Sequence, residues 1–232
     1  MGSLDNKLYI LHGWTTNVTK WDPFLDELKK RGVDPILLKI PGLTAPLETP
    51  WTIDDYVTWL ATQLPDDKHV SVLGHSNGGR IALAFALKFP ERLDQIFLID
   101  SAGIYHNDFV TKSKRTVFKL ASIIGKKITS SNNARNLLYR AASETDYMNA
   151  TPVMRQTMSN LIKVNLTPHL SKIQTPVTII WGKNDITTPF TDGQVFKNEL
   201  PNSSLYTIDY ASHSPQFTHV QEVADIIKNE FK

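Results

Sequence analysis

The chain has 232 residues, of which 41% are hydrophobic and 21% are charged, which is ordinary for a globular protein. This length suits one domain, or one domain with an inserted subdomain. The chain has no cysteine, which excludes disulfides, thiolate catalysis and cysteine-ligated metals. The N-terminus lacks the pattern of a secretory signal, and no window is apolar enough to span a membrane, so we expect a cytoplasmic protein.

The net charge of +2 is unevenly distributed along the chain. The segment 104–172 holds 11 lysines and arginines against three acidic residues, whereas the remainder is acidic overall. The simpler interpretation is a solvated surface on an inserted segment. The alternative is a positive face that attracts an anionic or carrier-bound substrate. We expect no nucleic-acid partner, because no basic block or recognition motif accompanies the excess.

Apolar runs alternate with amphipathic stretches through the first hundred residues. Strands are predicted at 7–11, 35–40, 69–73 and 95–99, and helices at 20–31, 52–64 and 78–89. Strands with nearly continuous apolar interiors indicate a parallel sheet that is covered on both faces. Sheets of this kind bind ligands at the carboxyl ends of their strands.

The pattern changes between Ile104 and Ser171, where the sequence is basic, looks helical and shows no convincing strand. We interpret 104–171 as a helical cap that is inserted into a core formed by 1–103 and 172–232. After the cap, strands are predicted at 176–181 and 204–208, and helices at 190–200 and 218–231. The predicted architecture is therefore an α/β fold with a mostly parallel sheet of about six strands.

The segment Gly74-His75-Ser76-Asn77-Gly78 lies directly between a predicted strand and a predicted helix. A turn this tight needs small neighbours, and it lifts the serine hydroxyl clear of the sheet at the positive end of the helix. The pattern alone could be a glycine-rich turn that happens to contain a serine. Its position between strand and helix favours Ser76 as a nucleophile.

A serine hydroxyl needs a base near neutral pH, and that base needs an acceptor that fixes its tautomer. Of the seven histidines, His213 lies in a loop after the last predicted strand, from which it can reach over the sheet edge. Asp185 follows the strand 176–181 on the same rim, although an aspartate in such a loop is often only an Asx-turn residue. Asp100, at the end of the strand 95–99, is the rival acid, and Asp209 is a weaker one.

The reaction also needs donors for the oxyanion that develops on the substrate. His12-Gly13-Trp14 ends the first predicted strand, so the backbone amides of Trp14 and Asn77 would face the hydroxyl from two sides. This assignment rests on position alone, because backbone donors make no direct demand on the side chain. The chemistry calls for no cofactor and no metal.

The order H-G-x, then G-x-S-x-G, then an aspartate after a strand, then a late histidine resembles the α/β-hydrolase superfamily over nearly the whole chain. The segments YILHGW, VLGHSNGGRIAL, PVTIIWGKND and ASHSPQFTHVQEVADII look like the small cap-bearing esterase branch. That branch includes carboxylesterases, carbon–carbon bond hydrolases and carrier-protein methyl ester esterases. The resemblance implies the triad Ser76–Asp185–His213 and an oxyanion hole from Trp14 and Asn77.

Two features depart from the family pattern. The family usually has two strands before the H-G-x strand, whereas few residues precede it here, which predicts a sheet shortened to six strands. The common D-x-P-G-x-G loop is replaced by Lys39-Ile40-Pro41-Gly42-Leu43, so we expect that loop to have a different shape. Neither departure involves the triad.

We therefore expect a serine hydrolase that cleaves carboxylic esters through an acyl-enzyme. The expected substrate is a small-molecule ester or acyl compound. If the basic segment forms a positive face, that substrate is anionic or carrier-bound. The expected oligomeric state is a monomer or homodimer. Two alternatives remain: a carbon–carbon bond hydrolase or lyase that uses the same triad, and a non-catalytic ligand-binding module on the same fold. Periodicity assigns no substrate-binding residue.

Overall fold

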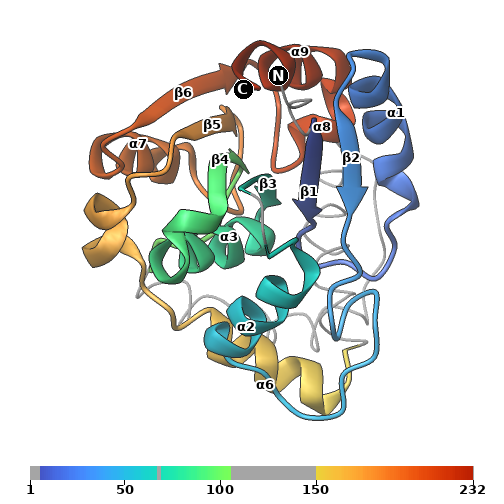
Figure 1. Cartoon of the computed structure of the whole chain (residues 1–232), viewed down its shortest axis with the longest axis vertical. Coiled ribbons are helices and arrows are strands. Elements are labelled where there is room, and N and C mark those ends of the chain that lie inside the picture. The colour runs from blue at the N-terminus through green and yellow to red at the C-terminus, as the bar shows by residue number, and fades with distance from the viewer. Residues whose placement is uncertain (1–5, 67–68, 106–149, 232) are drawn as a thin grey trace, which may run out of the picture.

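The computed structural model describes residues 6–66, 69–105 and 150–231 (Figure 1). Six strands form one parallel sheet with the order β2-β1-β3-β4-β5-β6. The strands are β1 Lys7–Leu11, β2 Asp34–Leu37, β3 Val70–His75, β4 Leu93–Ile99, β5 Val177–Gly182 and β6 Ser203–Ile208. The prediction of a six-stranded α/β sheet is confirmed.

Helices cover both faces of this sheet. The helices are α1 Asp22–Lys30, α2 Ile53–Gln63, α3 Asn77–Lys88, α6 Pro152–Leu161, α7 Phe190–Glu199, α8 Pro215–Thr218 and α9 Val220–Glu230, with 3-10 turns at Thr19–Trp21, Pro90–Arg92 and Thr167–Lys172. In Figure 1, α1 and α9 lie side by side at one end of the view, whereas α2 and α3 lie on the other side of the strands.

Strand side chains alternate between two separate apolar cores. Along β1, Leu8 and Ile10 belong to the core that α1 and α9 cover, whereas Tyr9 and Leu11 belong to the core on the side of α2 and α3. The register carries this alternation across the sheet, because Ile10 lies beside Leu73, and Leu73 lies beside Phe97. Both faces are buried, which explains why the strand sequences are apolar without interruption.

Most elements lie within two residues of their predicted bounds, but two regions differ from the prediction. The strand predicted at 35–40 ends at Leu37, because the chain turns away there and the Ile40 carbonyl accepts hydrogen bonds from the amides of residues 43–45. The helix predicted at 218–231 begins at Val220 as α9, because the backbone of His219 leaves the helical region (φ −130°, ψ 47°), and a separate short helix, α8, precedes it.

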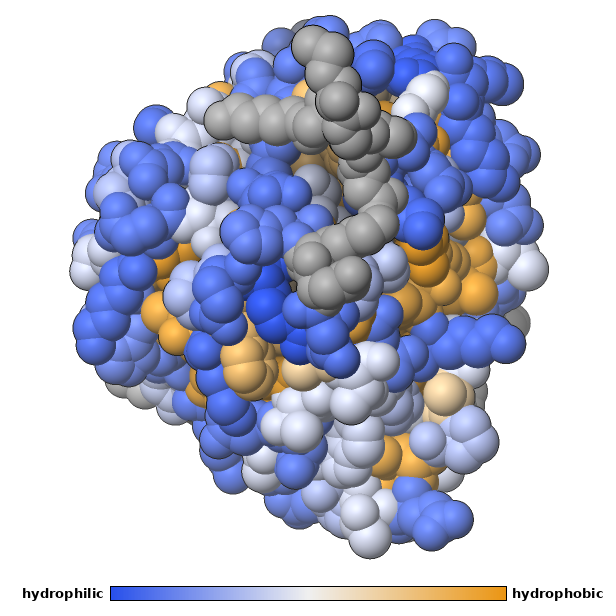
Figure 2. All heavy atoms as spheres, in the orientation of Figure 1, coloured by the Kyte–Doolittle hydropathy of each residue, from blue (hydrophilic) through white to orange (hydrophobic). Residues whose placement is uncertain are grey.

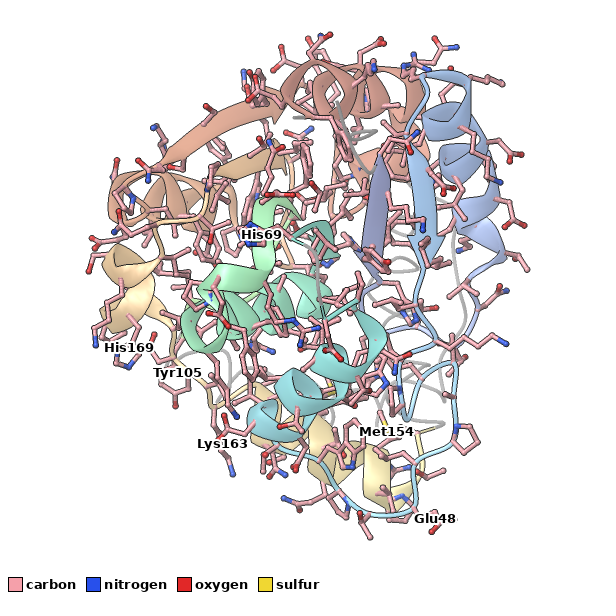
Figure 3. The ribbon with its side chains drawn as sticks, in the orientation of Figure 1. Glu48, His69, Tyr105, Met154, Lys163 and His169 are labelled. Carbon is pink, nitrogen blue, oxygen red and sulfur yellow. The ribbon has the colours of Figure 1, made fainter. Side chains whose placement is uncertain are left out.

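Helix α6 is the described helix of the predicted cap, and it packs against the loop before α2. The Trp51 amide donates to Thr157 Oγ1 (3.0 Å), and Asn160 Nδ2 donates to the Trp51 carbonyl (3.0 Å). Figure 3 shows Met154 of α6 and Glu48 of this loop at the same end of the molecule. Residues 106–149 lie outside the described residues, so the boundaries 104–171 remain a prediction.

None of the helices in the described ranges combines the length and apolarity that crossing a bilayer requires. The face in Figure 2 is mostly hydrophilic, with apolar atoms in separate groups between polar side chains. Isolated apolar groups of this kind are normal on a folded protein.

We predict that Thr52→Ala lowers the free energy of unfolding by about 1 kcal/mol. Thr52 caps α2: its hydroxyl oxygen accepts from the Asp55 amide (3.4 Å), and the Asp55 carboxylate accepts from the Thr52 amide (2.7 Å). Urea unfolding followed by tryptophan fluorescence measures the change.

Thr62→Ala, in the last turn of the same helix, is the matched control. Its hydroxyl donates only to the local Trp59 carbonyl (2.7 Å), and alanine is the better helix former, so this variant should be neutral or slightly stabilising. Equal effects of the two variants would contradict the cap.

Candidate active site

Ser76 lies in the turn between β3 and α3, in a backbone conformation that residues other than glycine rarely adopt (φ 52°, ψ −119°). Its amide donates to the Ile99 carbonyl (3.1 Å), and its carbonyl accepts from the amides of Gly79 (3.0 Å) and Ala102 (2.9 Å). A Cβ on Gly74 would lie 2.5 Å from Gly79 Cα, so the turn requires glycine there. The surrounding chain thus holds Ser76 in a strained conformation at the carboxyl end of β3.

The side chains of Ser76, His213 and Asp185 form a continuous line of hydrogen bonds. His213 Nε2 lies 2.9 Å from Ser76 Oγ, and His213 Nδ1 lies 2.8 Å from Asp185 Oδ2. Because an ionised carboxylate only accepts, the His213 proton belongs on Nδ1, which leaves Nε2 free to accept the serine proton. The Asp185 side chain is fully buried, whereas that of His213 is 24% exposed, so a substrate can approach the ring but not the acid.

Asp185 is also an Asx-turn residue, so the two roles considered for it coexist. Its Oδ1 accepts from the amides of Thr187 (2.7 Å) and Thr188 (3.1 Å), and its Oδ2 accepts from the Thr188 hydroxyl (2.7 Å). The Thr188 Oγ1 atom lies 3.2 Å from His213 Nδ1. The sequence analysis missed Thr188, although a hydroxyl residue shortly after an aspartate is the pattern of such a turn.

The chain that carries Trp14 and Asn77 lies close to Ser76. A Cβ on Gly13 would lie 3.1 Å from Ser76 Cβ, and one on Gly78 would overlap the Leu11 carbonyl, so the end of β1 presses against the start of α3. Neither the Trp14 amide nor the Asn77 amide donates to another group in the described part of the chain. Asn77 begins α3, and the first amides of a helix have no partner within it.

The buried ring of His75 supports the loop that carries His213. Its Nε2–H group donates to the His213 carbonyl (2.8 Å), and its ring packs against Trp21 and Phe217. Burial, followed by the nearby His213 ring, lowers the pKa of His75 to about 3. The ring is therefore neutral at ordinary pH and works as a fixed hydrogen-bond donor.

Asp100, the rival acid, ends β4 directly beside the same group. Its Oδ1 accepts from the Gly182 amide (2.8 Å), and its Oδ2 is buried without a hydrogen-bond partner among the described residues. Burial, and then the charge of Asp185, raise the pKa of Asp100 well above its usual value. Asp185, not Asp100, bonds His213. The second rival, Asp209, pairs with Lys183 at the surface (2.6 Å).

Asp100, Asp185 and His213 are also the one group in the described ranges whose potential metal ligands all lie within 4.8 Å of one another. Asp185 Oδ2 and His213 Nδ1 are already bonded to each other, and Asp100 Oδ1 is bonded to a backbone amide. A carboxylate that holds an imidazole accounts for these contacts without a metal ion.

A family model described as the alpha/beta hydrolase fold matches residues 6–220. The chain therefore belongs to the α/β-hydrolase family. Among its relatives is the pimeloyl-[acyl-carrier protein] methyl ester esterase of Nitrosomonas europaea, which is 25% identical over 90% of this chain and 88% of that protein. Another is the 2-hydroxy-6-oxononadienedioate/2-hydroxy-6-oxononatrienedioate hydrolase of Burkholderia vietnamiensis, 25% identical over 95% and 85%.

Solved structures show the same fold. A carboxylesterase structure from the thaumarchaeon Nitrososphaera gargenis superposes with a TM-score of 0.75 at 22% identity and covers 96% of this chain and 88% of that one. An alpha/beta hydrolase from a sediment metagenome of the lagoon of Mar Chica superposes with a TM-score of 0.71 at 24% identity, over 97% and 90%. At such identities the likeness concerns the fold alone.

We predict that Asp100→Asn becomes more stable relative to the wild type as the pH rises. Because its pKa is raised in the folded protein, the carboxyl keeps its proton there at pH values where the unfolded chain has already released it, above about 4. With its folded pKa raised, Asp100 favours the folded state less and less from that pH up to its folded pKa. Asparagine keeps an oxygen for the Gly182 amide and cannot ionise.

Urea unfolding at pH 5, 6.5 and 8 measures the dependence of the free energy of unfolding on pH, and its slope should be more positive in Asp100→Asn than in the wild type. Asp54→Asn, which changes an exposed carboxyl in the first turn of α2, should leave the slope unchanged. A wild-type slope that survives in Asp100→Asn would show that this carboxyl is already ionised in the folded protein.

Proposed function

We propose that this chain is a serine hydrolase that cleaves carboxylic esters through an acyl-enzyme, with Ser76 as nucleophile, His213 as base and Asp185 as the acid that orients His213. The observation that carries the proposal is the line of hydrogen bonds from Asp185 through His213 to Ser76, at 2.8 and 2.9 Å. Its elements are the parts that a hydroxyl needs to become a nucleophile near neutral pH.

In the first half of the reaction, Ser76 Oγ bonds to the ester carbonyl carbon while its proton passes to His213 Nε2. The carbonyl oxygen becomes an oxyanion that the amides of Trp14 and Asn77 bind. The tetrahedral intermediate then breaks its bond to the alcohol oxygen, which takes the proton from His213. Asp185 stays ionised and stabilises the imidazolium between these two proton transfers.

In the second half, water replaces the alcohol. The water oxygen attacks the acyl carbon while His213 Nε2 removes a proton from the water. His213 then gives that proton to Ser76 Oγ as the bond between Oγ and the acyl carbon breaks and the carboxylic acid leaves. No step needs a cofactor. The exposed part of the His213 ring gives the incoming water a route to Nε2.

A carbon–carbon bond hydrolase is the second candidate, because a hydrolase of 2-hydroxy-6-oxononadienedioate is among the relatives. Such chemistry would use the same three side chains. The two candidates differ in whether an acyl-enzyme accumulates, which a pre-steady-state burst with a chromogenic ester reveals. A non-catalytic binding module would neither turn over an ester nor react with a fluorophosphonate at Ser76.

For the substrate, we propose a small ester whose acyl part is anionic or carrier-bound. The relative from Nitrosomonas europaea is named for a carrier-protein methyl ester. The sequence 104–172 of this chain holds 11 basic and three acidic residues, a balance that would attract such a substrate. Most of that segment lies outside the described residues, so the proposal rests on its charge.

We predict that Ser76→Ala lowers kcat for p-nitrophenyl esters of graded chain length by about 10⁴-fold or more, and that Asp185→Asn lowers it by about 10³-fold or more. The first variant removes the nucleophile, and the second removes the charge that holds the ring. Ser204→Ala, at an exposed position on β6, is the control and should match the wild type. Unchanged turnover in Ser76→Ala would overturn the mechanism.

We further predict that kcat/KM for an ester of a dicarboxylic acid falls as ionic strength rises from about 10 to 150 mM, where the Debye length shrinks from about 30 to 8 Å. The neutral ester of the same chain length should show no such dependence. Equal salt dependence of the two esters would contradict attraction of an anionic acyl group and leave the ester-hydrolase mechanism intact.

A further inference from the structure

His12 takes part in no step of the proposed reaction. Its ring is nevertheless completely buried, and both ring nitrogens make hydrogen bonds. Nδ1 lies 2.8 Å from the Gly13 carbonyl oxygen, and Nε2 lies 3.0 Å from Thr44 Oγ1. A buried histidine with two short contacts of this kind has one tautomer and one orientation.

The direction of each hydrogen bond follows from the partners. The Gly13 carbonyl can only accept, so the ring proton is on Nδ1, and Nε2 must accept the hydroxyl proton of Thr44. The Thr44 oxygen in turn accepts from the Ile40 amide (2.9 Å). Burial lowers the pKa of His12, in keeping with a neutral ring. Three hydrogen bonds thus run in one direction, from Ile40 to the Gly13 carbonyl.

That carbonyl belongs to the peptide unit that also contains the Trp14 amide. In a trans peptide the C=O and N–H groups point in opposite directions, so fixing the oxygen fixes the direction of the N–H group. The unit lies beside the nucleophile, because a Cβ on Gly13 would be 3.1 Å from Ser76 Cβ and 2.9 Å from His75 Nδ1. Hydrogen bonds in series also polarise one another, which makes the far N–H a better donor.

The contact between His12 and Thr44 also joins two loops that are separated by a hollow over part of their length. A hollow of about 470 Å³ is lined by Thr16 and Val18 on one side and by residues 37–39 and 43–46 on the other. The two loops therefore do not pack on each other along their whole length, and the hydrogen bond between His12 and Thr44 is a tie between them.

We propose that His12 and Thr44 are positioning residues that hold the Gly13–Trp14 peptide so that its N–H group points at the oxyanion formed on Ser76. This inference rests on the proposed function. It adds that the 40–44 loop, in which the sequence departs from the family pattern, sets the strength of the oxyanion hole through a side-chain hydroxyl.

The test compares Thr44→Val, which keeps the shape of the side chain and removes the hydroxyl, with Thr44→Ser, which keeps the hydroxyl. Thr44→Val should lower kcat for a p-nitrophenyl ester by about 10-fold with little change in KM, because loss of a whole oxyanion donor is worth about 10²- to 10³-fold. Thr44→Ser should recover most of that loss. A trifluoromethyl ketone, which forms a tetrahedral adduct with the serine, should bind Thr44→Val more weakly by the same factor.

His12→Asn is a second test, which breaks the hydrogen bond between His12 and Thr44 from the side of His12. Its amide nitrogen can take the place of ring Nδ1 toward the Gly13 carbonyl, but nothing reaches Thr44. Both single variants break the same hydrogen bond, so the double variant should be no slower than the slower single variant. If one single variant fails to fold, the other still measures the effect.

Three outcomes are decisive. A loss in Thr44→Val that appears in kcat and in the trifluoromethyl ketone inhibition constant, and is recovered in Thr44→Ser, supports the inference. The inference is overturned if Thr44→Val has the wild-type kcat, or if Thr44→Ser loses as much activity as Thr44→Val. In either case the proposed function still stands, provided that a fluorophosphonate labels Ser76 as in the wild type. Failure of the wild type to label or turn over overturns both.

Discussion

The hydrogen bond between the His213 ring and the Ser76 hydroxyl joins two loops that are 137 residues apart in the chain. It forms because β3 and β6 are strands of one parallel sheet, whose carboxyl ends meet at the same rim. The same constraint brings in Asp185 after β5, Asp100 after β4 and Trp14 after β1. Misplacing any one strand end would separate groups that must meet within about 3 Å.

Much of the site's precision comes from groups that never touch a substrate. His75 donates to the carbonyl of His213, Thr188 donates to the carboxylate of Asp185, and His12 donates to the carbonyl of Gly13. Each of these bonds fixes one of the groups to which the proposed reaction gives a role. The rotamers and peptide planes are therefore set before a substrate arrives, which is the condition for electrostatic stabilisation without reorganisation.

The sequence predicted the sheet, and it singled out three side chains that the structure brings together in one line of hydrogen bonds. Ser76 could be found because it has a glycine two positions before it and another two positions after it, and Asp185 and His213 because each follows a predicted strand. Asp100 was recognised only as a rival, since its burial beside Asp185 depends on packing between β4 and β5. Thr44 and Thr188 could not be found, because a threonine hydroxyl has no pattern until the fold gives it a partner. The end of β2 was misjudged for the same reason: the turn at 40–45 depends on hydrogen bonds within the loop.

Strand β2, which forms one border of the sheet, has a consequence for how the protein behaves in a crowded solution. It is only four residues long, and its second residue is Pro35, which has no backbone proton to offer. A foreign strand approaching this border would find too few donors and acceptors in line to extend the sheet. Because β2 is so short, it offers few backbone groups for pairing and is a poor template for self-association.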